Sequence, residues 1–304
     1  MEELDRMLEA RRRTFVRCVF AVSVAINVLG RPGVTRAEPA KAADGRLDLS
    51  RIVSVGGTVT EILFDLGLGP AVVGVDTSSV YPAEATQLPQ VGYQRTLAAE
   101  GILSLRPTVV ILTSEAGPPP VLAQLRSAGV TLLTLPADPT VAAAEERIRL
   151  LGTAVGRTQR AEEMLRALKS DLARAQPSDG GSKTKVLFIY ARGSGSMNVS
   201  GRDTAADEMI ELAGATNAMT AFEGFRPLNA ESLVAAAPDV LLLTTRGLES
   251  VGGPEGLLKL PGVAATPAGQ GSRIVALDDL LLLGFGPRTG EAVAALASQL
   301  HGTR

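Results

Sequence analysis

Tyr93 and Arg95 are the two residues of this sequence whose types and spacing most suggest chemistry. They stand two residues apart in the segment QVGYQRTLAAEGILSLRP, in a chain of 304 residues that has three tyrosines and no tryptophan. A free phenol has a pKa of about 10, and a neighbouring guanidinium favours its ionised form. A phenolate oxygen is a hard donor that suits a hard cation such as ferric iron. Loop tyrosines also commonly cover the edge of a core, so the pair leaves a ligand role and a packing role open.

Three further arginines are candidates for contact with an anionic ligand. Arg192 lies in the loop YARGSGSMNVSGRD, which follows an apolar strand pattern, and Arg246 comes directly after the run VLLLTT. Both fall at the carboxyl ends of predicted strands, where the ligands of open α/β sheets bind. Arg226 is the third candidate, and a solvated loop position is the alternative for each of them. Tyr190 falls within a strand pattern, which favours a place in the core.

Several chemistries are disfavoured by composition. The net charge of -2 and the absence of a basic patch argue against a nucleic-acid partner. Cys18 is the only cysteine and His301 the only histidine, so a His-based catalytic triad or a thiolate metal site is not expected. The segment GGTVTE lacks the G-x-G-x-x-G nucleotide fingerprint, and RGSGS lacks the lysine of a P-loop.

The N-terminus has the pattern of a secretory signal peptide, which we expect to cover residues 1–37. The basic segment RRRTFVR precedes the short apolar run CVFAVSVAINVLG, and RPGVTRA then ends in the small residue Ala37. RRTFV also resembles a twin-arginine export signal, although arginine clusters occur in ordinary signals too. Cys18 begins the apolar run and is badly placed for a lipid anchor. We therefore expect an exported, periplasmic protein without a cysteine in its mature form.

The rest of the chain alternates between short apolar strands and helices, which predicts an α/β fold. We expect an N-terminal lobe over residues 38–138, a linker helix over residues 139–176 and a C-terminal lobe over residues 177–304. Each lobe should be Rossmann-like with a central, mostly parallel sheet. A single long backbone helix should join them, with a ligand cleft between the lobes at the carboxyl ends of the strands.

Five segments of the chain resemble those of class III substrate-binding proteins of ABC importers, and most closely the periplasmic haemin-binding proteins. They are VGYQRTLAAEGILSLRP, SEAGPP, SGRDTAADEMIELAGATNA, RPLNAESLVAAAPDVLLLTT and LLLGFGPRTGEA. The resemblance covers essentially the whole mature chain. It implies capture of ferric haem in the interlobe cleft through a tyrosine of the first segment, followed by delivery to an inner-membrane permease. Tyr93 stands at the position of that tyrosine, and tyrosine is a known axial haem ligand.

The resemblance also implies roles for other residues. Arg95, Arg192, Arg226 and Arg246 would surround Fe(III) protoporphyrin IX, with Arg95 beside either the Tyr93 phenolate or a propionate. Glu115 in SEAGPP and Glu231 in LNAESL would present one acidic group on each lobe to arginines of the permease. The partners expected are haem, the ABC permease with its ATPase, and an outer-membrane haem receptor system. We expect a monomer that is not an enzyme.

Two alternatives remain, together with one expectation about stoichiometry. A ferric siderophore or cobalamin binder would use the same fold, and a two-lobed α/β enzyme is the alternative from another class. In some relatives a histidine of the C-terminal lobe binds a second haem, and Arg192 occupies its place here. An arginine remains protonated and does not ligate iron, whereas it hydrogen-bonds a propionate well. We therefore predict one haem per protein.

Overall fold

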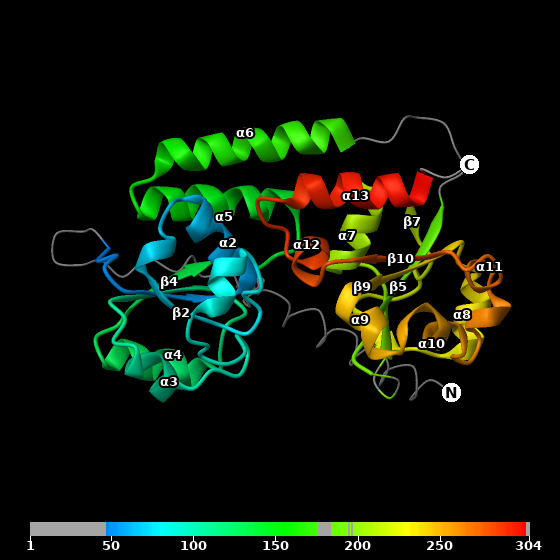
Figure 1. The fold of residues 1–304 in the computed structure, drawn as a ribbon, viewed down its shortest axis with the longest axis horizontal. Helices are drawn as coiled ribbons and strands as arrows, with labels where there is room; N and C mark the ends of the chain where they lie inside the picture. Colours follow the sequence, from blue (N-terminus) through cyan, green and yellow to red (C-terminus); the bar gives the residue numbers. More distant parts are fainter. Residues whose placement is uncertain (1–46, 176–183, 194, 196, 302–304) are drawn as a thin grey trace, which may run out of the picture. The chain divides into compact units, whose positions relative to one another are not determined.

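Figure 1 shows the computed structural model of the chain, in which residues 47–175, 184–193, 195 and 197–301 are described. The expected signal peptide, residues 1–37, lies outside these ranges. Within them, no helix is both long enough and apolar enough to cross a bilayer.

The first sheet has four parallel strands in the order β2-β1-β3-β4. The strands are β1 (Ile52–Val55), β2 (Val72–Val75), β3 (Val109–Thr113) and β4 (Thr131–Leu135). Every residue of β1 and β3 is buried, as expected for central strands with helices on both faces. The helices around this sheet are α2 (Gly57–Asp65), α3 (Ala99–Ser104), α4 (Pro119–Ser127) and α5 (Val141–Ala154), with 3-10 turns η1 (Gly69–Ala71) and η2 (Ala83–Gln87).

Two helical layers cover opposite faces of the first sheet. Successive strand residues point to opposite faces. Ile52 of β1 packs in the core that contains α2 and α5, whereas its neighbour Val53 packs with Ile102 of α3 and Leu125 of α4. We call this sheet, with α2 to α5, the N-terminal lobe.

The helical segment predicted over residues 139–176 contains two helices. α5 ends at Ala154, Gly156 has a φ of 70°, and α6 (Thr158–Ala175) follows. A Cβ atom on Gly152 would lie 2.3 Å from the Cβ of Ala161, so glycine at this position allows the two helices to pack closely. The long backbone helix expected from the sequence is therefore α6 alone, because α5 packs against α2 and β4 of the N-terminal lobe.

The second sheet is mixed, with the strand order β10-β9-β5-β6-β8 and β7 paired to β5. Its strands are β5 (Lys185–Ala191), β6 (Met197–Ser200), β7 (Thr216–Asn217), β8 (Phe225–Pro227), β9 (Val240–Thr244) and β10 (Ile274–Leu277). β10, β9, β5 and β7 are parallel, whereas β6 is antiparallel to both β5 and β8. A mostly parallel α/β sheet with an antiparallel edge matches the expected fold class.

Helices also flank the second sheet, and we call this part the C-terminal lobe. They are α7 (Ala205–Leu212), α8 (Ala230–Ala236), α9 (Thr245–Ser250), α10 (Gly253–Leu258), α11 (Pro267–Gln270), α12 (Asp279–Leu283) and α13 (Thr289–His301), with the 3-10 turn η3 (Val263–Ala265). α6 lies along α13, as Figure 1 shows.

One hydrophobic core runs through both lobes. It contains Ile52 and Ile62 of the N-terminal lobe, Leu165 of α6, and Phe188 and Leu296 of the C-terminal lobe. The lobes are thus connected by a continuous apolar layer as well as by α6, and the described residues from 47 onward belong to one compact unit. The sequence had suggested a helix as the only connection.

Candidate ligand-binding site

Tyr93 lies in a loop just beyond the carboxyl end of β2. The loop begins after a parallel bridge between Val75 and Gln90, and Gly92 turns the chain with a φ of 96°. The N–H of Thr96 then donates to the carbonyl oxygen of Tyr93 at 2.9 Å, which closes a tight turn. The Tyr93 side chain is half-buried. A tyrosine is thereby presented at the sheet edge where ligands of α/β folds bind.

The Tyr93 loop and the SEAGPP segment form one unit. The N–H of Gly117 donates to the carbonyl of Gln94, and the N–H of Leu97 donates to the carbonyl of Gly117, both at 2.9 Å. Across the same pair of loops, Nη2 of Arg95 lies 2.5 Å from Oε2 of Glu115. Both side chains are about half exposed, so this ion pair contributes only about 0–1 kcal/mol to stability. A residue predicted to contact ligand thus pairs with one predicted to contact the permease.

Two tyrosines, one from each lobe, influence the pKa of Arg95. The pKa of Arg95 is raised, first because it donates a hydrogen bond to Glu115, although partial burial opposes the shift. The phenols of Tyr93 and Tyr190 add to this shift. Tyr190 belongs to β5 of the C-terminal lobe, so residues from both sheets lie near the same guanidinium.

Tyr190 has a polar partner in addition to the core contacts predicted from the sequence. Nε of Arg192 donates to the Tyr190 hydroxyl at 2.7 Å, and the guanidinium carbon lies 5.3 Å from the ring centroid. The half-buried ring packs against the shared core and lies 6.0 Å from the ring of Phe225. The structure therefore adds Tyr190 to the candidate site. The missed signal was its place one residue before the carboxyl end of a strand, two residues from an arginine.

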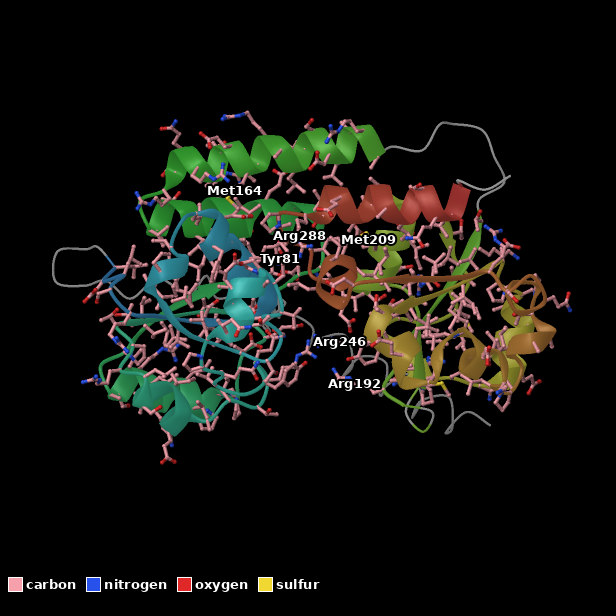
Figure 2. The ribbon with its side chains drawn as sticks, viewed as in Figure 1. Tyr81, Met164, Arg192, Met209, Arg246 and Arg288 are labelled. Carbon is pink, nitrogen blue, oxygen red and sulfur yellow. The ribbon has the colours of Figure 1, made fainter. Side chains whose placement is uncertain are left out.

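Arg246 lies at the same sheet edge as Arg192, whereas Arg226 does not. Arg246 is the second residue of α9, which directly follows β9, and the N–H of Gly193, next to Arg192, donates to Oγ of Ser250 in the same helix at 2.9 Å. Figure 2 labels both arginines, and Arg246 is exposed. Arg226 pairs with Val199 on the opposite sheet face from Tyr190, and its guanidinium lies 4.6 Å from the Phe222 ring centroid. The structure does not bring Arg226 into the tyrosine cluster.

Glu231 lies in the first turn of α8 with an exposed side chain. Its N–H donates to Oδ1 of the N-cap residue Asn229 at 2.8 Å. Among the described residues no ion pair involves Glu231, so its carboxylate is open to a partner, whereas that of Glu115 is already paired with Arg95.

The described residues hold no group of three or more His, Cys, Asp or Glu side chains that would bind a metal ion. One surface hollow in the same part of the chain lies at α6; Tyr93 is not among its lining residues, most of which are charged. Tyr93 and Tyr190 are both half-buried and lie near the strand ends of their sheets. Any metal bound there would depend on one or two phenolate oxygens.

The chain belongs to the periplasmic binding protein family, whose sequence pattern it matches over residues 52–281. A sequence relative is the uncharacterized ABC transporter substrate-binding lipoprotein YvrC of Bacillus subtilis, 29% identical over 83% of this chain and 80% of YvrC. A vitamin B12-binding protein of Pectobacterium carotovorum is 26% identical over 55% of this chain and 60% of that protein.

Solved structures resemble the chain more closely. The periplasmic heme-binding protein RhuT of Roseiflexus sp. RS-1, in apo form, is 48% identical with a TM-score of 0.80, covering 83% of this chain and 98% of RhuT. The periplasmic heme-binding protein BhuT, in complex with two hemes, is 42% identical with a TM-score of 0.78, covering 82% of this chain and 97% of BhuT. The family and these neighbours consist of binding proteins, in agreement with the class predicted from the sequence.

Proposed function

We propose that this chain is an exported haem-binding protein that delivers ferric protoporphyrin IX to an inner-membrane ABC permease. The observation that carries the proposal is that Tyr93, beyond β2, and Tyr190, near the end of β5, each stand two residues before an arginine, with Nε of Arg192 donating to the Tyr190 hydroxyl at 2.7 Å. Two phenols near guanidinium groups supply hard anionic oxygen for Fe(III) and positive charge for propionates. The similarity to RhuT and BhuT supports the same ligand.

Within this proposal Tyr93 is the axial ligand of the iron. Its hydroxyl has no hydrogen-bond partner among the described residues, whereas that of Tyr190 accepts from Arg192. In this proposal Arg192 and Arg246 would pair with the propionates. Arg95 supplies positive charge near Tyr93, for a propionate or for the iron-bound phenolate. Tyr190 is a second possible oxygen donor, and it removes one reason for predicting a single haem.

The proposal also covers the partners. The exposed carboxylate of Glu231 and the paired carboxylate of Glu115 would meet arginines of the permease, one on each lobe. We further propose export through the N-terminal signal, a monomeric state, and hand-over of the ligand without chemical change to it. An outer-membrane haem receptor system would supply the ligand.

A haemin titration followed by absorbance tests the function directly. We expect saturable binding and the charge-transfer bands of high-spin ferric iron with a phenolate ligand. Cobalamin and a ferric siderophore serve as competitors, because a vitamin B12-binding protein is among the sequence relatives. Saturable binding of either competitor, with no phenolate band from haemin, would replace haem by that ligand on the same fold.

A further inference from the structure

A second connection joins the two lobes, at a distance from α6 along the chain. The loop of residues 284–288, between α12 and α13 of the C-terminal lobe, lies against α2 of the N-terminal lobe. Thr58 Oγ1 donates to the carbonyl of Gly284 at 2.9 Å. Nε and Nη2 of Arg288 donate to the two carboxylate oxygens of Glu61 at 2.8 and 3.2 Å. We call this contact, together with Arg147, the interlobe joint.

The Glu61–Arg288 pair is shielded from water. Glu61 is 3% exposed, and the Arg288 side chain is 21% exposed. Tyr81 of the N-terminal lobe covers the guanidinium, whose carbon lies 3.6 Å from the ring centroid (Figure 2). Arg288 is therefore held by a bidentate carboxylate and by an aromatic face, both from the opposite lobe. Such a pair fixes orientation as well as distance.

Arg147 of α5 adds a third point of attachment. Its side chain is 2% exposed. Nη1 donates to the carbonyls of Pro136 and Asp138, at 3.0 and 3.1 Å, and Nη2 donates to the carbonyl of Phe285 at 2.6 Å. One buried guanidinium therefore ties the segment after β4 to the loop of the C-terminal lobe.

Glycines on both sides allow the close approach. A Cβ atom on Gly286 would lie 3.1 Å from Cγ2 of Thr58, and one on Gly57 would lie 2.8 Å from Cδ1 of Leu280. These glycines belong to GGTVTE, which lacks the nucleotide fingerprint, and to GFGPRTG, part of one of the five segments that resemble the haemin-binding proteins. Their role in the structure is to let the two lobes meet.

We propose that the interlobe joint holds the lobes at a fixed spacing, so that Glu61, Arg147 and Arg288 are positioning residues for the ligand. Tyr93 and Tyr190 come from different sheets, so their separation depends on how the lobes are held. None of the three joint residues would contact the ligand, and each would act by fixing the separation between Tyr93 and Tyr190. The ligand named in the test rests on the proposed function, whereas the geometric claim does not.

Pulsed electron resonance between two spin labels measures the lobe spacing. Ser127→Cys on α4 and Glu255→Cys on α10 place exposed labels on the two lobes, with Cys18→Ser to prevent other labelling. We expect a narrow distance distribution that moves by about 1 Å or less when haemin is added. Glu61→Gln should broaden this distribution and weaken haemin binding roughly tenfold. The charge-transfer bands should keep their wavelengths, because the ligand atom is unchanged.

Glu145→Gln is the matched control. Glu145 on α5 pairs with Arg149 and Lys169 and is about as exposed as Arg288, but neither partner belongs to the C-terminal lobe. This variant should leave the distances and the haemin affinity unchanged. Arg288→Lys keeps the charge but loses the bidentate geometry, and it carries the test if Glu61→Gln does not fold.

An unchanged distance distribution in a folded Glu61→Gln or Arg288→Lys protein would overturn the proposal, whatever the haemin affinity. A wild-type chain that does not bind haemin would refute the proposed function instead, and the spin-label distances would still decide whether the joint sets the spacing.

Discussion

Replacing Arg147 with methionine is the most direct test of how the lobes are held together. Methionine preserves the unbranched aliphatic stem of the side chain, but the substitution removes three hydrogen bonds to the carbonyls of Pro136, Asp138 and Phe285. Hydrogen bonds from a charged group contribute about 1.5–3 kcal/mol each, so the three contribute roughly 5–9 kcal/mol.

The free-energy cost of burying the charged guanidinium offsets part of the stability that these hydrogen bonds contribute. Desolvation lowers the pKa of Arg147 from its usual range to about 10, although Asp138 and Glu115 oppose the shift. At about 1.4 kcal/mol per pKa unit, holding the buried guanidinium ionised costs roughly 3 kcal/mol. The expected net loss for Arg147→Met is therefore about 2–6 kcal/mol. A chain of this size would melt roughly 5–20 °C lower.

Thermal unfolding followed by far-ultraviolet circular dichroism at pH 7 measures this loss. Arg149→Met on the same helix is the control, because Arg149 is half exposed and its nearest carboxylate oxygen, on Glu145, is 3.7 Å away. It should change stability by less than about 0.5 kcal/mol. Arg147→Lys should fall between the two, because an ammonium group does not reproduce the fork of a guanidinium. Equal melting temperatures for Arg147→Met and Arg149→Met would refute the reasoning.

Four further predictions follow from the site and from the surface charges. Tyr93→Phe should abolish the phenolate charge-transfer bands and most haemin affinity, and Tyr190→Phe should keep the bands; the opposite pattern in absorbance would make Tyr190 the axial ligand. Native mass spectrometry after titration should show one haem per chain, and a two-haem species that disappears in Tyr190→Phe would contradict this count. Charge reversal at Glu231 should slow haem delivery to the permease in proteoliposomes without changing haemin affinity, since rim charges act mainly on association; the same change at Glu115 should also release Arg95, so normal transport by the double variant would remove the docking proposal. The pKa of Glu208 is raised first by burial and then by neighbouring acidic residues. The contribution of Glu208 to stability is therefore full below its usual pKa of 4.5 and is lost as the pH rises through the raised value. Glu208→Gln should stabilise the chain by about 0.5 kcal/mol at pH 7.5 and by less at pH 4.5. Equal gains in melting temperature at both pH values would contradict this.

The periodicity of the sequence was sufficient for the architecture. Continuous apolar runs such as RIVSV and TVVILT became buried parallel strands, because only such runs suit a sheet covered on both faces. The loop position of Tyr93 was also predictable, since Gly92, which takes a positive φ, marks a turn two residues after the bridge residue Gln90. Both features depend on residues that are close together in the chain.

The break between α5 and α6 was only partly predictable. The helical pattern continues through residues 139–176, and Gly156 marks where the first helix ends. The sequence does not show that α6 then packs along α13, which begins at residue 289. The predicted single connection between the lobes was incomplete for this reason.

The sequence by itself determined which side chains stand at the ends of the strands, because strand ends and turns are set by local backbone preferences. It did not determine which of these side chains meet. The pairing of Arg95 with Glu115 and the burial of Glu61 with Arg288 join residues that are 20 and 227 positions apart. Such contacts depend on strand register and on the packing of two lobes into one core. Only the tertiary structure decides them, because the same charged residues would be solvated surface groups in any other packing.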